Sequence, residues 1–252
     1  MPPKNLIRLF LVPVLLILAL LGVRESRAGS LTIAPGNICF IPGLYHDLLN
    51  RNPSSSEIAS GQAYLAGNTR AQYAATFLAG TEYQTNLIQG WYRRFLGRPA
   101  SSSEIADRLS YFGSGGTDEG VIADIVSSDE YFHLPRVGAT NSGYITALFQ
   151  DLLGRTPSSA ELIYWLGQMG GGLTRLQLAQ KILSSDEYRV ILIQSWYRKY
   201  LGRSPSNDEI GAAIGIFNSS GTDEQIITII VGSDEYFNRS GICTMFLPLV
   251  TR

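Results

Sequence analysis

The sequence predicts an all-α protein made of tandem helical repeats, and two recurring phrases carry this prediction. Leu-Gly-Arg, or Leu-Asn-Arg in the first copy, occurs four times, and each time a phrase ending in Glu-Tyr follows. The spacing from arginine to tyrosine is 32 residues in the first copy and 33 in the others. Such constant spacing indicates one unit, expected to contain three helices, repeated four times. The recurring residues are Arg51, Arg98, Arg155 and Arg203, with Glu82, Glu130, Glu187 and Glu235.

The first and second helices of each unit have recognisable ends. Glycine, or Asn50 in the first copy, follows the last leucine of the first helix, where a left-handed residue commonly ends a helix. Serine followed three residues later by glutamate then forms a capping box, which satisfies free backbone donors at a helix start. Four such boxes in register predict four helix starts. The pairs are Ser54 with Glu57, Ser101 with Glu104, Ser158 with Glu161, and Ser206 with Glu209.

The third helix of each unit follows a glycine-rich break and begins at a threonine. Three of these threonines have glutamine three residues later, which again forms a capping box. The helix runs to the Ser-Asp-Glu-Tyr phrase, whose residue types favour the start of a further helix. The threonines are Thr69, Thr117, Thr174 and Thr222.

The four units are expected to form two duplicated lobes. The interval between the arginines is longest between the second and third copies, and Pro135, Gly138 and Gly143 predict a linker there. A Trp-Tyr pair followed by two basic residues occurs in the second and fourth copies, which indicates that a pair of units was duplicated. The predicted segments are 29–43 at the N-terminus, a lobe at 44–133, a linker at 134–143, a lobe at 144–237 and a tail at 238–252.

Residues 1–28 are predicted to be a secretory signal peptide. Lys4 and Arg8 precede an apolar run over residues 9–23, and Ser26 and Ala28 supply the small residues of a cleavage site. We expect cleavage after Ala28; the alternative is an uncleaved N-terminal anchor, since the run is nearly long enough to span a bilayer. The expected localisation is secreted, periplasmic or at the cell surface.

The two cysteines, Cys39 and Cys243, flank the repeat array. Such a pair often forms a disulfide bond in an oxidising compartment, and we expect one here; the alternative is two buried thiols. Two cysteines without a nearby histidine do not make a zinc site. The loop that starts at Asp151 lacks the ligand pattern of an EF-hand. We therefore expect no metal ion and no cofactor.

The charge balance excludes some partners. The chain of 252 residues has 20 basic and 21 acidic residues and a net charge of −1. It thus lacks the strong positive field typical of proteins that bind nucleic acids or anionic membranes. Nucleic acid is not an expected partner, and membrane contact is expected only through an uncleaved N-terminal segment.

The third copy carries the clearest resemblance to a known family. Residues 153–157 read Leu-Gly-Arg-Thr-Pro, residues 164–165 read Tyr-Trp, and residues 182–188 read Ile-Leu-Ser-Ser-Asp-Glu-Tyr. With these motifs the chain resembles the bacterial family of DUF4214 repeats, which is distantly similar to phycobilisome linker domains. The other copies lack the Tyr-Trp pair. The resemblance implies an all-helical fold in secreted or surface proteins, and it supplies no catalytic residue.

Two sets of residues are candidates for a functional role. We expect the recurring arginines and glutamates to be structural ion pairs, because they recur wherever the unit recurs; the alternative is four pockets for an anionic group. Aromatic and basic residues are favoured at protein interfaces, although helical aromatic residues also pack in cores. The candidate interaction residues are Trp91, Tyr92, Arg93, Arg94, Trp196, Tyr197, Arg198 and Lys199.

The residues predict a binding role rather than a chemical one. The two histidines, His46 and His133, occupy unrelated places in their units, and no catalytic triad or nucleotide-binding motif is present. We expect a non-catalytic interaction or scaffolding module of the bacterial cell envelope, with another envelope or secreted protein as its partner. One alternative is a carbohydrate-binding module; another is an enzyme of unknown class, which needs a concave pocket. A carbohydrate site would use Tyr64, Tyr111 and Tyr164 as its aromatic residues.

Overall fold

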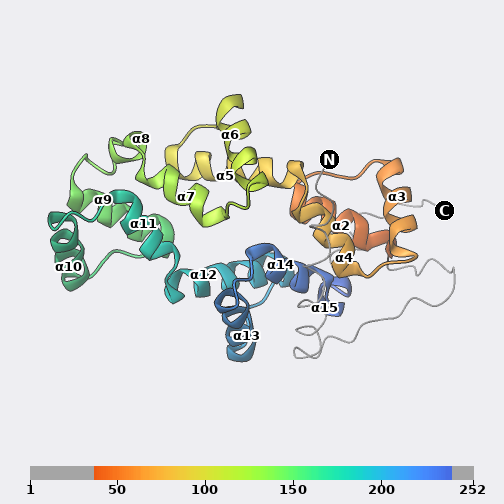
Figure 1. Cartoon of the computed structure of the whole chain (residues 1–252). Coiled ribbons are helices and arrows are strands. Elements are labelled where there is room, and N and C mark those ends of the chain that lie inside the picture. Colours follow the sequence, from red (N-terminus) through yellow and green to blue (C-terminus); the bar gives the residue numbers. More distant parts are fainter. Residues whose placement is uncertain (1–36, 240–252) are drawn as a thin grey trace, which may run out of the picture. The chain divides into compact units, whose positions relative to one another are not determined.

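The computed structural model describes residues 37–239, and this part of the chain is helical without β-strands, which confirms the all-α class (Figure 1). The predicted signal peptide and Cys243 lie outside the described residues. No helix of the described part is long and apolar enough to cross a membrane. The elements are α2 (Asn37–Leu49), α3 (Ser55–Leu65), α4 (Arg70–Leu78), α5 (Thr81–Leu96), α6 (Ser102–Gly113), α7 (Asp118–Ser127), α8 (Asp129–Phe132), α9 (Asn141–Leu148), η1 (Phe149–Leu153), α10 (Ser159–Gly170), α11 (Arg175–Leu183), α12 (Asp186–Trp196), η2 (Tyr197–Leu201), α13 (Asn207–Asn218), α14 (Asp223–Gly232) and α15 (Asp234–Phe237).

The helix ends form for the local reasons that the sequence indicates. All four capping boxes are present at the starts of α3, α6, α10 and α13. The residue before each recurring arginine is left-handed, with φ between 55° and 73°. Glycine adopts this conformation without a steric cost, and asparagine tolerates it better than most residues. These left-handed residues are Asn50, Gly97, Gly154 and Gly202.

The Ser-Asp-Glu-Tyr phrase begins a helix, as predicted. In the second and fourth copies its serine accepts a hydrogen bond from the tyrosine backbone N–H at 3.1 Å, and the short helices α8 and α15 follow. In the third copy the phrase leads into the long helix α12, which continues into the π-helical segment η2 before Gly202. The predicted long helix of the first lobe is α5.

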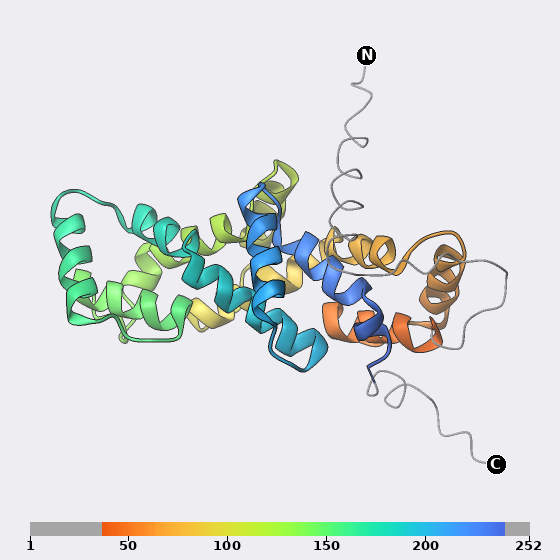
Figure 2. The ribbon, with the colours of Figure 1, turned by 90° about the horizontal axis from the view of Figure 1, so that it is seen from below.

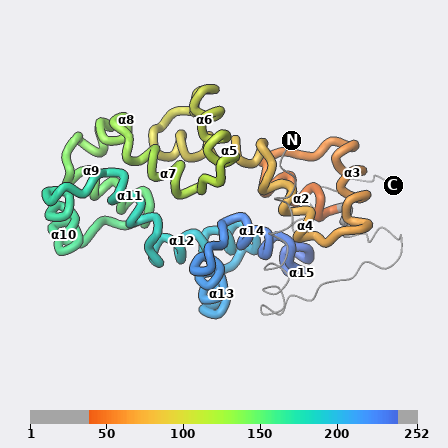
Figure 3. Tube along the Cα trace, viewed as in Figure 1, coloured from red at the N-terminus to blue at the C-terminus, as the bar shows by residue number. Residues whose placement is uncertain are grey.

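The chain forms two compact units whose borders differ from those of the predicted lobes. Unit 1 contains residues 37–80 and 194–239 of the described chain, and unit 2 contains residues 81–193 (Figure 3). The predicted linker at 134–143 therefore lies inside unit 2. The reason is that third helices pair across copies: α4 packs against α14 within unit 1, and α7 against α11 within unit 2 (Figure 2). Their apolar faces cover each other.

Each unit has its own core. In unit 2, the fully buried Val121 and Val126 of α7 and Leu178 of α11 belong to one cluster with Tyr131 and Tyr144. In unit 1 the buried residues lie on helices from both ends of the described chain. They include Phe40, Ile41, Leu78, Ile227 and Val231.

Unit 1 has the same helix packing as unit 2, but its equivalent helices occur in a different order along the chain. In unit 2, the rings of Tyr131 and Tyr144 lie edge to face with centroids 6.0 Å apart. In unit 1, Tyr236 and Phe40 make the same contact at 6.1 Å. Residues 133–140 join α8 to α9 in unit 2, whereas the equivalent helices of unit 1, α15 and α2, are the last and first helices described.

Candidate functional site

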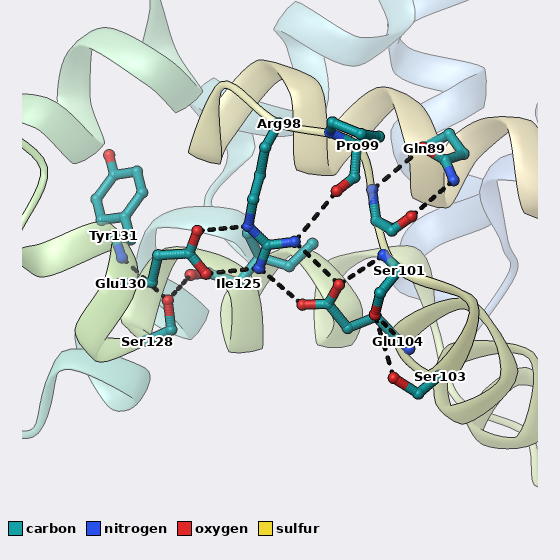
Figure 4. Close-up of polar contacts among 11 residues, drawn as sticks. Gln89, Arg98, Pro99, Ser101, Ser103, Glu104, Ile125, Ser128, Glu130 and Tyr131 are labelled. Carbon is teal, nitrogen blue, oxygen red and sulfur yellow. Dashed lines mark hydrogen bonds and ion pairs between the residues drawn. The ribbon is translucent and has the colours of Figure 1, made fainter.

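The recurring arginine is the centre of a network that ties three helix ends together. In the second copy, Arg98 donates from Nε and Nη2 to the carboxylate of Glu130 at 2.5 and 2.6 Å. It also donates from Nη1 and Nη2 to Glu104 at 3.0 and 2.8 Å (Figure 4). A further bond from Nη1 reaches the carbonyl of Pro99 at 3.1 Å. All five N–H groups of the guanidinium are used, so none is left for an anionic ligand.

The third and fourth copies repeat this geometry. Arg155 donates to Glu187 at 2.6 and 2.9 Å and to Glu161 at 2.7 and 3.0 Å. Arg203 donates to Glu235 at 2.5 and 2.7 Å, and to Glu209 at 2.6 and 2.9 Å. The predicted ion pairs are thus present in these copies.

In the first copy, Arg51 makes the bidentate contact with the capping glutamate, Glu57, at 2.8 and 3.1 Å. Its predicted partner Glu82 belongs to the other compact unit. The pairing of Arg51 with Glu82 stays a prediction.

Sequence reasoning missed the second carboxylate of each network. The capping glutamate accepts from the arginine and from the backbone N–H of its serine at once, as Glu161 does with Ser158 at 2.8 Å. The available signal was that this glutamate follows the arginine by six residues in every copy. One residue therefore both caps the second helix and ties it to the end of the first.

The networks lower the pKa values of the capping glutamates. Hydrogen bonds from the arginine, followed by bonds from the capping serine, lower the pKa of Glu57 and Glu161 from 4.5 to about 2. The arginine likewise lowers the pKa of Glu104 and Glu209 to about 2. The side chain of Arg155 is 37% exposed, so the network lies at the surface rather than in the core.

A second recurring network joins a buried tyrosine to an aspartate. In unit 2 the Tyr131 hydroxyl donates to Asp151 at 2.8 Å, and Arg136 forms an ion pair with the same carboxylate at 2.8 Å. Arg136 also donates to the carbonyl of Phe95 at 2.8 Å. Burial, and then the charge of Asp151, raise the pKa of Tyr131. Asp151, considered above only as the start of a calcium loop, therefore has a structural partner set.

The aromatic part of the predicted interaction surface is buried, which corrects that expectation. Tyr92, Trp196 and Tyr197 are at most 8% exposed, and Trp91 is half-buried against Phe112. Spacing alone could not separate a core-facing from a solvent-facing aromatic. The basic members of the set are exposed: Arg93, Arg94, Arg198 and Lys199. One of them, Arg94, donates to the backbone carbonyl of Asp151.

The three candidate tyrosines of the carbohydrate hypothesis differ in their surroundings. Tyr64 is half-buried and packs against Tyr73 at a centroid distance of 5.4 Å. Tyr111 is 39% exposed, and its ring lies directly over Gly116, where a Cβ atom would be 2.2 Å from it. Tyr164 is 56% exposed, and its ring makes an edge contact with Trp165 at a centroid distance of 4.9 Å.

The most exposed large apolar side chains of the described residues lie side by side on α10. Ile163 is 70% exposed and Tyr164 is 56% exposed. One turn further, Gly167 and Gln168 are also exposed. We call these four residues the α10 face. The equivalents of Ile163 in the other copies are Ala59, Ala106 and Gly211, so this apolar face is specific to the third copy.

The described residues contain no group of three or more histidine, cysteine, aspartate or glutamate side chains that could hold a metal ion.

Comparison with known proteins finds one family model that matches part of the chain. No curated protein and no solved structure matches the chain. Residues 123–190 match the family model described as Domain of unknown function (DUF4214). The match runs from the end of α7 to the start of α12 and includes the Arg155 network and the α10 face. The family resemblance drawn from the motifs of the third copy is thus confirmed over residues 123–190.

Proposed function

We propose that the protein is a non-catalytic interaction or scaffolding module that acts outside the cytoplasm, in the bacterial cell envelope. Its partner is another envelope or secreted protein, which binds at the α10 face. The observation that carries the proposal is the pair of exposed apolar side chains, Ile163 and Tyr164, on a helix of a small helical unit.

The chemistry of the recurring polar residues supports a role without catalysis. The arginines of the second to fourth copies use all their N–H groups on glutamates and on one backbone carbonyl each. The glutamates in turn are held as carboxylates by these arginines. Groups that saturate one another at helix ends stabilise the repeat and are poor acid–base catalysts at neutral pH.

The composition of α10 favours a protein partner. From residue 159 to residue 173 the only charged side chain is Glu161, and Arg155 pairs with it. An uncharged surface with an aliphatic and an aromatic side chain resembles the core of a protein interface, which is depleted of charges and enriched in aromatic residues. A branched aliphatic side chain such as Ile163 adds little to sugar stacking, whereas it adds apolar area to a protein contact.

The localisation and the disulfide belong to the same proposal. The signal-like N-terminus supports a location of the mature chain outside the cytoplasm, where cysteines oxidise. Cys39 is 4% exposed in α2, and the neighbouring Phe40 contacts Phe237 at a centroid distance of 6.0 Å. Cys243 follows Phe237 by six residues. A bond between Cys39 and Cys243 is therefore within reach of the chain.

The test is binding of purified residues 29–252 to cell-envelope fractions by the normal protein and by the double variant Ile163→Ser, Tyr164→Ser. We expect the variant to lose at least tenfold in affinity, since buried apolar anchors dominate interface energies, and to keep its melting temperature. The matched control is Gly211→Ser with Ala212→Ser, at the equivalent positions of α13. Equal binding by all three proteins would overturn the α10 face as the binding surface.

Treatment of the fractions separates the protein partner from a glycan. Protease treatment of the fractions is expected to abolish binding, and periodate treatment to leave it intact. Loss after periodate alone favours the carbohydrate-binding alternative, for which the exposed side chain of Tyr164 is the specific observation.

A further inference from the structure

Unit 1 is assembled from two segments that are far apart in the sequence. Residues 37–80, the N-terminal segment, supply α2, α3 and α4, and residues 194–239, the C-terminal segment, supply η2, α13, α14 and α15. Neither segment buries its apolar residues alone, because Leu78 of α4 and Val231 of α14 belong to helices that pack against each other. The folded unit therefore depends on the pairing of the two segments.

The pairing is specific in shape and charge. Arg70 at the start of α4 forms an ion pair with Asp234 at the start of α15, and its guanidinium lies 4.2 Å from the ring centroid of Phe237. The Tyr236 hydroxyl donates to Asp47 at 3.0 Å. The backbones of α4 and α14 approach so closely that a Cβ atom on Gly232 would lie 2.8 Å from Ala71. This surface recognises one partner, the N-terminal segment of this sequence.

Unit 2 contains the equivalent interface, but there a short stretch of chain joins the two paired parts. Arg175 forms an ion pair with Asp129 at 2.5 Å, and its guanidinium lies 4.5 Å from the ring centroid of Phe132. In this unit residues 133–140 join the paired parts directly. In unit 1 the paired segments are joined only through the whole of unit 2, by Ala79 and Gly80 at one end and by α12 at the other.

We propose that unit 1 is an assembly joint, at which the N-terminal segment of one chain docks onto the C-terminal segment of a second copy. The contacts of the joint are identical in the closed monomer and in the exchanged pair, so protein concentration decides between them. Exchange of an identical element in this way is a low-cost route to oligomers. This inference rests on the proposed scaffolding function and names a second copy of the chain as one partner in it.

The experiment uses charge reversal, in two full-length mature chains that carry different tags. Arg70→Asp and Asp234→Arg each place like charges across the joint of their own chain. In a mixture, an exchanged heterodimer restores opposite charges at both joints. Under reducing conditions, which keep Cys39 and Cys243 from fixing the closed form, we expect the mixture to give a species of twice the monomer mass that carries both tags.

Unit 2 supplies the matched control. Arg175→Asp and Asp129→Arg make the same charge changes where residues 133–140 hold the paired parts in one chain. Their mixture is expected to stay monomeric. A monomeric unit 1 mixture, or an equal yield of dimer from the unit 2 mixture, overturns the proposal.

A second experiment covers the case in which charge reversal prevents folding. Two chains with different tags carry serine at positions 39 and 243 and are otherwise unchanged. They are unfolded, mixed at high concentration and refolded together; a dimer that carries both tags is expected, and its absence from the folded chains contradicts exchange. Neither experiment alters the α10 face, so failure of the joint and failure of envelope binding are distinguishable.

Discussion

At the residue scale, the recurring arginine is the centre of each repeat. Arg155 follows the left-handed Gly154, and its guanidinium meets Glu161 at the start of α10 and Glu187 at the start of α12. A lysine carries one point charge without this planar fork and cannot make two bidentate contacts. The residue thus fixes the angle between helices through directed hydrogen bonds, at a site that remains in contact with solvent.

Loss of the guanidinium of Arg155 should destabilise the fold. Arg155→Ala is expected to lower the free energy of unfolding by about 1–2 kcal/mol, because exposed ion pairs contribute little singly and a bidentate network of two contributes more. Urea unfolding measures the change. Arg93→Ala, at an exposed position of α5, is the control and is expected to change stability by less than about 0.5 kcal/mol. An equal effect of both substitutions would show that the network is not structural.

At the element scale, local signals decide where helices begin and end. The capping box of α10 and the left-handed Gly154 use interactions within a few residues, so the sequence alone was enough to predict them. The same capping glutamates connect the helices to one another. A helix start is therefore held by a side chain from the preceding helix end.

Acid should weaken these connections. The pKa of each capping glutamate is about 2 in the folded chain and is expected near 4.3 in the unfolded chain. Because its pKa is lower in the folded chain, the ionised glutamate stabilises the fold. This stabilisation is fully present above pH of about 5 and is lost as the pH falls toward 2. The melting temperature is thus expected to fall over this range. Glu161→Gln should show a smaller fall, and an unchanged pH profile in this variant would contradict the assignment.

The sequence could not predict which helices pair. The apolar faces of α4, α7, α11 and α14 are alike, so any two of the four third helices satisfy the same pattern. The choice of α4 with α14 and α7 with α11 is a long-range property. The same limit explains why the sequence misplaced the aromatic residues on an interaction surface. The residue type of Trp196 fits both a core and an interface, and only the packing shows that it is buried.

At the scale of the whole molecule, one structural unit occurs twice with different connections. The Tyr131–Asp151 bond of unit 2 has its counterpart in the Tyr236–Asp47 bond of unit 1. In unit 1 this bond joins α15 to α2, and Arg239 adds a contact to Asp47 at 3.9 Å. The first and last described helices thus close unit 1 together. The family match at 123–190 covers much of the unit whose parts are continuous in sequence.

The predicted disulfide between Cys39 and Cys243 would link the two segments that form unit 1 and so stabilise the protein. Peptide mapping of the purified, oxidised protein is expected to find Cys39 linked to Cys243 within the fraction of monomer mass. Reduction should lower stability by up to about 4–5 kcal/mol, the value of the chain-entropy model for a loop of this length. Cys39→Ser should melt like the reduced protein. Two free thiols in the purified protein would contradict the bond.

The most direct measurement compares stability and envelope binding in two variants, Arg155→Ala and Ile163→Ser with Tyr164→Ser. The central claim is that the recurring network maintains the fold while the α10 face binds the partner. We expect Arg155→Ala to melt earlier and, while folded, to bind with unchanged affinity; the α10 variant should melt normally and fail to bind. Loss of binding by Arg155→Ala at an unchanged melting temperature would contradict the claim and make the arginine networks the binding sites.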